Sequence, residues 1–155
     1  MPPVSFPSVE WFAALAARMD AAPERYRKLG PLDITLVPRI VFADGGTELY
    51  ELRFRGLRCV AVRRIATTAE VEGPHPVLVE GEYAAWREMV ENVRANGRAD
   101  LSHTLNFLTL PDWPLRLVPL DEDAGQLDVD RFYRYIESLQ EFFDEAADVE
   151  TCMAA

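Results

Sequence analysis

Side chains that build metal centres and disulfide frameworks are scarce in this sequence. It contains two cysteines, Cys59 and Cys152, and two histidines, His75 and His103. The cysteines are far apart in the chain, and neither histidine belongs to a C-x-x-C, H-E-x-x-H or comparable metal-ligand spacing. We therefore expect two reduced thiols, no metal site and no cofactor.

Long hydrophobic runs and a basic leader are also absent. No stretch approaches the roughly 18 uninterrupted apolar residues that a membrane span needs, and residues 1–5 lack a signal-peptide pattern. The charge is one-sided, because 16 basic residues face 26 acidic ones and give a formal net charge of −10. Phosphate backbones and anionic lipid surfaces repel such a chain. We expect a cytoplasmic protein that neither binds nucleic acid nor inserts stably into a membrane.

What the chain does have is enough apolar surface for one core. Hydrophobic residues make up 49% of its 155 positions and charged residues 27%, a composition and length typical of a single compact domain. We expect one domain over residues 1–155, with its core in about residues 5–147 and a flexible tail over residues 148–155.

Three helices are predicted from capping residues and apolar spacing. The first follows Ser8 and ends before Pro23, the central one covers residues 83–96 and stops at Gly97, and the last begins at Asp128. The residues expected to face the core are Trp11, Phe12, Leu15 and Met19 in the first helix, Tyr83, Trp86, Val90 and Val93 in the second, and Phe132, Ile136, Leu139 and Phe143 in the third.

Strands are predicted between the first two helices. Residues 32–42, 50–54 and 57–65 show alternation or β-branched enrichment, and turn residues separate them. These segments should form three antiparallel strands. The loop 67–76 precedes one more short apolar run at residues 77–79, which we expect to be a fourth strand.

The segment VLVEGEYAAW at residues 77–86 resembles the strand, glycine and tryptophan-bearing helix of the sterol carrier protein type 2 family. The order of elements over about residues 5–147 is similar too. The resemblance implies an α+β fold, in which a twisted, largely antiparallel sheet of about five strands is covered by helices around an apolar cavity.

The last third of the chain departs from the family pattern. By the resemblance, residues 105–110 should form a strand, residues 111–114 (PDWP) replace a glycine-aspartate turn, and residues 115–126 are an insertion. The resemblance also implies the residues that would line the cavity. They are Trp86, Phe107, Trp113, Phe132, Ile136 and Phe143.

The function implied by the resemblance is non-catalytic binding, and possible transfer, of a hydrophobic ligand such as a fatty acyl chain, a sterol or an isoprenoid. One alternative is a small enzyme in which Asp33, Asp112 or His103 acts as an acid or base inside the apolar pocket. Another is a protein interaction or regulatory module that uses Trp113 and the last helix as a contact patch. The sequence leaves the oligomeric state and the identity of the ligand open.

One basic cluster interrupts the acidic sequence. It could receive a ligand's anionic head group, although charged residues that alternate on a solvated strand face are the more ordinary interpretation, and we do not include them in the predicted site. The cluster consists of Arg53, Arg55, Arg58, Arg63 and Arg64.

Overall fold

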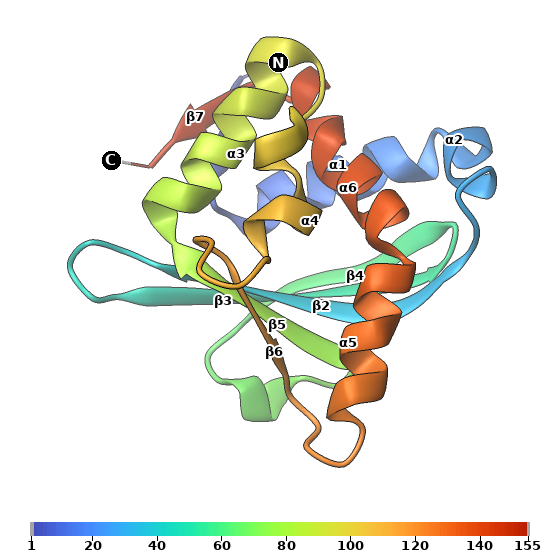
Figure 1. The fold of residues 1–155 in the computed structure, drawn as a ribbon. Helices are drawn as coiled ribbons and strands as arrows, with labels where there is room; N and C mark the ends of the chain where they lie inside the picture. The colour runs from blue at the N-terminus through green and yellow to red at the C-terminus, as the bar shows by residue number, and fades with distance from the viewer. Residues whose placement is uncertain (1, 155) are drawn as a thin grey trace.

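A five-stranded mixed sheet with helices packed on one of its faces is the frame of the protein (Figure 1). The structure is a computed structural model and describes residues 2–154. In chain order the elements are β1 (Val4–Phe6), α1 (Val9–Asp20), α2 (Pro23–Arg27), β2 (Leu32–Val41), β3 (Thr47–Gly56), β4 (Arg58–Ile65), η1 (Thr68–Glu70), β5 (Pro76–Glu82), α3 (Tyr83–Asn96), η2 (Leu101–His103), α4 (Leu105–Leu108), β6 (Arg116–Pro119), α5 (Gly125–Arg134), α6 (Ile136–Asp144), η3 (Glu145–Asp148) and β7 (Thr151–Met153).

The sheet has the strand order β4-β3-β2-β5-β6. Strands β2, β3 and β4 form the predicted antiparallel meander, and Gly45 and Gly56 take positive φ angles at its two turns. Strand β5 pairs with β2 in parallel, and β6 pairs with β5 antiparallel. The prediction of an α+β fold with a largely antiparallel sheet of about five strands is confirmed.

Two helices form where their caps predict them. The Ser8 hydroxyl accepts the backbone N–H of Trp11 at 3.0 Å and starts α1. Gly97, with φ +84°, ends α3 and donates its N–H to the Val93 carbonyl. The predicted core residues of α1 are all buried, and in α3 Met89 joins Trp86, Val90 and Val93 in the core.

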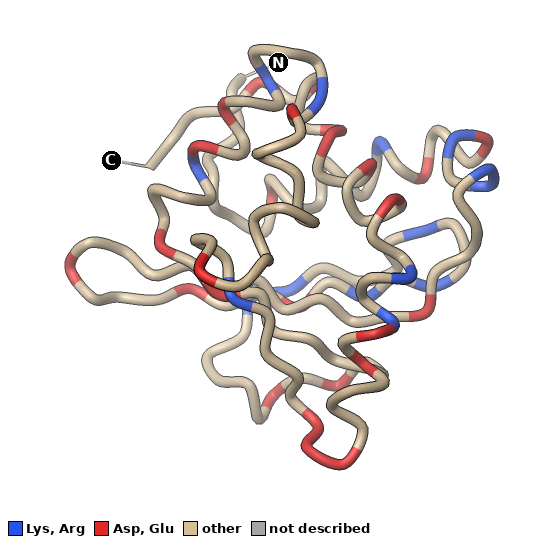
Figure 2. The backbone as a smooth tube through the Cα atoms, viewed as in Figure 1, with Lys and Arg blue, Asp and Glu red and all other residues tan. Residues whose placement is uncertain are grey.

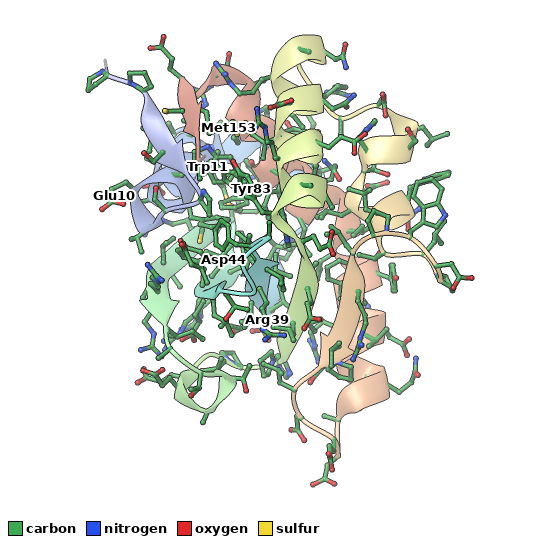
Figure 3. The ribbon with its side chains drawn as sticks, turned by 90° about the vertical axis from the view of Figure 1, so that its left-hand side faces the viewer. Glu10, Trp11, Arg39, Asp44, Tyr83 and Met153 are labelled. Atoms are coloured by element: carbon green, nitrogen blue, oxygen red, sulfur yellow. The ribbon has the colours of Figure 1, made fainter. Side chains whose placement is uncertain are left out.

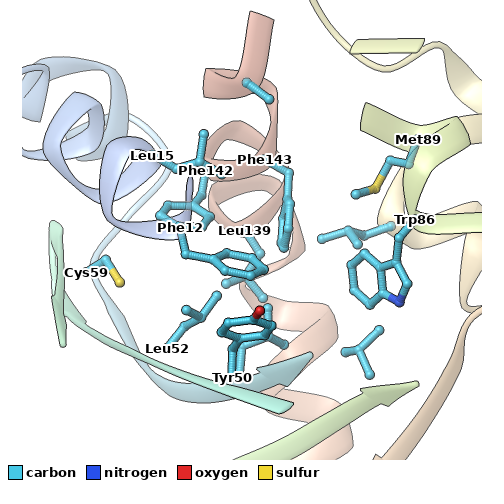
Figure 4. Close-up of a cluster of buried hydrophobic side chains, with 14 of the residues drawn as sticks. Phe12, Leu15, Tyr50, Leu52, Cys59, Trp86, Met89, Leu139, Phe142 and Phe143 are labelled. Atoms are coloured by element: carbon cyan, nitrogen blue, oxygen red, sulfur yellow. The ribbon is translucent and has the colours of Figure 1, made fainter. Parts of the chain in front are cut away.

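Aromatic side chains fill the space between the sheet and its helices (Figure 4). The Phe12 ring from α1 lies 4.9 Å from Tyr50 of β3 and 6.4 Å from Phe143 of α6, centroid to centroid. Phe143 in turn lies 6.1 Å from Trp86 of α3. These contacts make one continuous apolar core.

The opposite face of the sheet is covered by the loop that contains η1, the green segment below the sheet in Figure 1. A small apolar cluster lies there, formed by Val37, Leu49, Ile65 and Leu78 with Val71, Val118 and Leu120 packed against it. Beside this cluster the buried carboxylate of Glu51 accepts hydrogen bonds from Arg53, Arg63 and the backbone N–H of Gly73. The loop is therefore fastened to the sheet.

Residues 105–110 do not form a strand, which corrects the prediction made by resemblance. Residues 105–108 are the helix α4, because Thr104 accepts the N–H of Phe107 and the Gln140 side chain accepts the N–H of Leu105. The fifth strand is β6, which lies within the supposed insertion at residues 115–126 and pairs with β5 from Val77 to Glu80.

The last helix differs from its prediction in two ways. It begins at Gly125, so Asp128 lies inside its first turn, and the Asp128 carboxylate faces His75 (Oδ1 to Nδ1, 3.5 Å) and does not cap the helix. The chain then leaves helical geometry at Tyr135 (φ −98°, ψ 8°), which separates α5 from α6. The two helices therefore run along different parts of the sheet (Figure 1).

The C-terminal tail is structured up to Ala154, in contrast to the flexible tail expected over residues 148–155. Residues 151–153 form β7, which pairs in parallel with β1, and Trp11 donates its indole N–H to the Thr151 hydroxyl at 3.1 Å. Figure 3 shows Trp11, Tyr83 and Met153 close together in this region. The Tyr83 hydroxyl donates to the Ala154 carbonyl. Residue 155 lies outside the described residues.

The bond between Trp11 and Thr151 gives the first prediction. Replacing Thr151→Val keeps the side-chain volume but leaves the fully buried Trp11 N–H without an acceptor. We expect the free energy of unfolding to fall by about 1–3 kcal/mol, measured by urea denaturation. The exposed neighbour Cys152→Ser is the control and should leave the unfolding midpoint unchanged. Equal stability of both variants would show that this tail contact does not hold the fold.

Candidate ligand-binding groove

An open apolar groove of about 520 Å³ lies between the end of α4, the strand β6 and the helix α5. Its lining comprises residues 109–113 and 115–117 together with Val129 and Tyr133, and we call it the β6 groove. Its volume falls within the range of about 300–1,000 Å³ found for small-molecule sites.

The irregular chain between α4 and β6 forms one wall of the groove. Asp112 takes a positive φ of 69° between two prolines, and this turn carries Trp113 outward. The Thr109 hydroxyl donates to the Leu105 carbonyl at 2.7 Å and lies 3.1 Å from the Tyr133 hydroxyl of α5. These bonds join the α4 wall to the α5 wall and fix the width of the groove.

Large apolar side chains are exposed along the rim. Trp113 is 41% exposed, Leu110 37% and Tyr133 36%. The Phe107 ring packs edge-on against Trp113, with centroids 5.8 Å apart. Scattered exposed leucines are ordinary, but three such residues around one groove favour a binding site for an apolar molecule.

Leu115 connects the groove with the core. It lines the groove, yet it is only 1% exposed and belongs to the main aromatic cluster. Its neighbour is Gly81 of β5, where a Cβ atom would lie 2.3 Å from Leu115 Cδ2 and 3.3 Å from Trp86 Nε1. The lack of a side chain at Gly81 therefore lets Leu115 pack close to the Trp86 indole.

The six residues predicted to line a cavity lie in three settings. Trp113 lines the β6 groove and Phe107 contacts it, whereas Ile136 is half-buried at the start of α6 and packs against the core. The remaining three, Trp86, Phe132 and Phe143, are fully buried in the aromatic cluster. Contact of these six residues with a ligand stays a prediction.

Sequence reasoning missed most of the groove lining. Leu110 and Leu117 fall in a predicted strand and a predicted insertion, so the sequence gives no reason to expect them near each other. Val129 and Tyr133 of α5 are four residues apart and share one helix face, a signal that the sequence does contain. The stronger core stripe of the same helix, which includes Phe132, obscures that signal.

A second open groove, of about 560 Å³, lies over one end of the sheet, and we call it the sheet groove. Its lining mixes apolar residues such as Val60 with the charged side chains of Asp33, Arg53 and Arg55. It reaches the covered face of the sheet beside the Glu51 ion pairs. The β6 groove is the better candidate because it carries the exposed aromatic rim and borders the core.

Most of the basic cluster is engaged in ion pairs. Arg53 and Arg63 bind Glu51, Arg58 binds Asp20, and Arg64 lies 3.9 Å from Glu48. These pairs give the cluster a structural role, because Arg53 and Arg63 bind the buried Glu51 under the loop with η1, whereas Arg58 and Arg64 are exposed on the edge strand β4. Figure 2 shows the acidic segment between β6 and α5 at the far end from the chain termini.

The three residues weighed as acid or base catalysts do not come together. Asp112 lies in the β6 groove, and Asp33 lies in the sheet groove with its Oδ2 3.5 Å from His75 Nε2. His103 lies outside both linings, with its imidazole 2.6 Å from Asp100 and 3.1 Å from Glu88. The geometry therefore gives no acid-base pair within the β6 groove.

Burial raises the pKa of the Cys59 thiol to about 12, which makes it a poor nucleophile at neutral pH. Over residues 2–154 no group of three or more His, Cys, Asp or Glu side chains is placed to hold a metal ion. Within the same residues, no helix has the length and apolar character needed to span a membrane.

His103 gives a pH-dependent prediction. Its hydrogen bond with Asp100 raises the pKa of His103 above 6.5 and lowers the pKa of Asp100 to about 2. Because the folded-state pKa of His103 is raised, its contribution to stability is complete below pH 6.5 and is lost as the pH rises through the folded value. We expect His103→Gln to reduce the fall in unfolding midpoint between roughly pH 6 and pH 8.

The same bond can be tested by NMR titration of the imidazole. Asp100→Asn should move the pKa of His103 downward, because it removes the carboxylate. A wild-type His103 that titrates at or below 6.5 would contradict the role of this bond.

The fold of this protein is similar to that of known proteins, although its sequence is not. No protein-family model and no curated protein matches the chain. The crystal structure of sterol carrier protein 2 is similar, with a TM-score of 0.63 and 16% sequence identity, over 90% of this chain and 95% of that chain. A solution structure from Thermus thermophilus, of a conserved hypothetical protein described as possibly sterol carrier protein, has a TM-score of 0.56 and 18% identity, over 90% of this chain and 88% of that chain. The chain therefore has the sterol carrier protein fold, as the resemblance at residues 77–86 predicted.

Proposed function

We propose that this protein binds a hydrophobic small molecule, such as a fatty acyl chain, a sterol or an isoprenoid, and carries it without performing chemistry on it. The observation that carries the proposal is the β6 groove, whose exposed aromatic rim leads to Leu115 and from there to the core. The likeness to sterol carrier protein 2 supports the same class of ligand. The two free thiols support a location in a reducing compartment such as the cytoplasm.

The burial of an alkyl chain is sufficient for binding. Removing roughly 300 Å² of apolar ligand surface from water at about 25 cal/mol per Å² contributes on the order of 7 kcal/mol before ordering costs. After the ordering costs are subtracted, the remaining free energy corresponds to dissociation constants in the micromolar to millimolar range. Because apolar burial is non-directional, the groove should accept several ligands of similar length.

In this proposal the three buried residues Trp86, Phe132 and Phe143 form the inner walls of the ligand-binding site. The rings pack closely, with Trp86 and Phe143 centroids 6.1 Å apart, so a ligand that goes deeper than the groove must move side chains. Leu115 is the side chain between the groove and these rings. Trp113 and Phe107 act at the entrance in this arrangement.

A carboxylate on the α5 wall of the groove should weaken binding. Val129→Glu places a carboxylate on the α5 wall of the β6 groove, where an alkyl chain would have to desolvate it. We expect at least a tenfold loss of affinity for a fluorescent fatty acid or N-phenyl-1-naphthylamine, measured by fluorescence titration. The unfolding midpoint, measured in parallel, separates lost binding from lost fold.

The matched control is Val60→Glu, which puts the same charge into the sheet groove at a 48% exposed position. It should leave the affinity unchanged. If Val60→Glu weakens binding and Val129→Glu does not, the ligand occupies the sheet groove. If the wild-type protein shows no saturable binding of any apolar probe, the proposed function is wrong.

A further inference from the structure

The indole N–H of Trp86 is a buried hydrogen-bond donor that has no partner among residues 2–154. The side chain is fully buried in the first half of α3. More than nine in ten buried polar groups in folded proteins are paired, and an unpaired one costs free energy. By contrast, the equally buried Trp11 donates its N–H to Thr151. The missing partner of Trp86 therefore requires an explanation.

The unpaired N–H faces the part of the core that adjoins the β6 groove. A Cβ atom added to Gly81 would lie 3.3 Å from Trp86 Nε1, 3.3 Å from the Pro114 carbonyl oxygen and 2.3 Å from Leu115 Cδ2. These three atoms thus surround one point beside the backbone of β5. Figure 4 shows the Trp86 nitrogen directed away from the Phe143 ring.

The Leu115 side chain separates this point from the groove. Leu115 lines the β6 groove on one side and packs in the core on the other. Its backbone N–H donates to the Leu108 carbonyl at 2.9 Å. A ligand can reach the Trp86 N–H from the groove only when the Leu115 side chain moves to another rotamer.

We infer that Trp86 Nε1 and the Pro114 carbonyl oxygen form the binding site for the uncharged hydroxyl head group of a long-chain alcohol. The indole N–H can only donate and the carbonyl can only accept. A hydroxyl group satisfies both, since it accepts from Trp86 and donates to Pro114. An ammonium group cannot accept a hydrogen bond, and a carboxylate would carry an unpaired charge into the apolar core.

This inference rests on the proposed function and specifies the ligand class of the same groove. A carboxylate ligand has a different place to bind, because Arg116 is exposed at the rim of the groove. A fatty acid anion would therefore keep its head group at the rim, while a fatty alcohol would place its head group next to Trp86. The two ligand types should respond differently to a change at Trp86.

The test compares three probes with Trp86→Phe, which removes the N–H and keeps an aromatic ring. N-phenyl-1-naphthylamine reports apolar binding, and 1-decanol and decanoate are titrated as competitors. We expect Trp86→Phe to weaken the binding of 1-decanol about three- to tenfold more than it weakens the binding of the dye or decanoate, because only 1-decanol loses a hydrogen bond. Trp11→Phe is the matched control outside the groove. It should leave the affinities for the dye, 1-decanol and decanoate in the same order as in the wild-type protein.

NMR of the wild-type protein keeps the inference testable if Trp86→Phe does not fold. The indole ¹⁵N–¹H resonance of Trp86 should move downfield with 1-decanol and stay in place with decanoate. An unchanged resonance at saturating 1-decanol, or an equal loss of affinity for all three probes in Trp86→Phe, would overturn the inference while the proposed function stands. Absence of binding of all three probes to the wild-type protein would overturn both.

Discussion

The packing of Phe143 in the aromatic core is the constraint on which the rest of the arrangement depends. This one ring of α6 contacts Phe12 of α1, Trp86 of α3 and its neighbour Phe142, with centroids 5.5 to 6.4 Å apart. Helices that come before, between and after the strands of the sheet are thereby held together on one face of it. Aromatic pairs at such distances add to the free energy of simple apolar burial.

The position of α6 also determines where the groove forms. Phe142 and Phe143 hold α6 over the sheet, whereas the helix α5, which ends at the change of direction at Tyr135, packs against the edge strand β6. Val129 and Tyr133 then lie opposite Thr109 and Trp113. The groove is thus a consequence of a helix break next to a short edge strand, and the Thr109 to Tyr133 contact holds its walls together.

The other face of the sheet is closed by polar contacts. Burial would raise the pKa of Glu51, yet hydrogen bonds from Arg53, the Gly73 N–H and Arg63 hold that pKa below its ordinary value. The carboxylate is completely buried, so removal of either arginine would leave its charge only partly compensated and would destabilise the fold. These bonds keep the loop with η1 against the sheet, and the apolar residues beneath it are not open to a ligand.

The sequence by itself determined the segments whose signals are local. The Ser8 cap, the Gly45 and Gly56 turns and the Gly97 stop act over a few residues, so α1, the three-strand meander and α3 could be predicted from spacing alone. The resemblance at residues 77–86 indicated the fold, because that segment holds both a central strand and the tryptophan-bearing helix.

Tertiary structure alone decided the last third of the chain. Residues 105–108 are helical because Gln140, far along the chain, accepts the Leu105 N–H, and residues 116–119 become a strand because the edge of β5 is free to pair. The tail is ordered for the same kind of reason, since β7 pairs with β1 at the other end of the sequence. Contacts between distant residues leave no periodic pattern in either segment, so the groove that they form could be recognised only once the fold had brought its walls together.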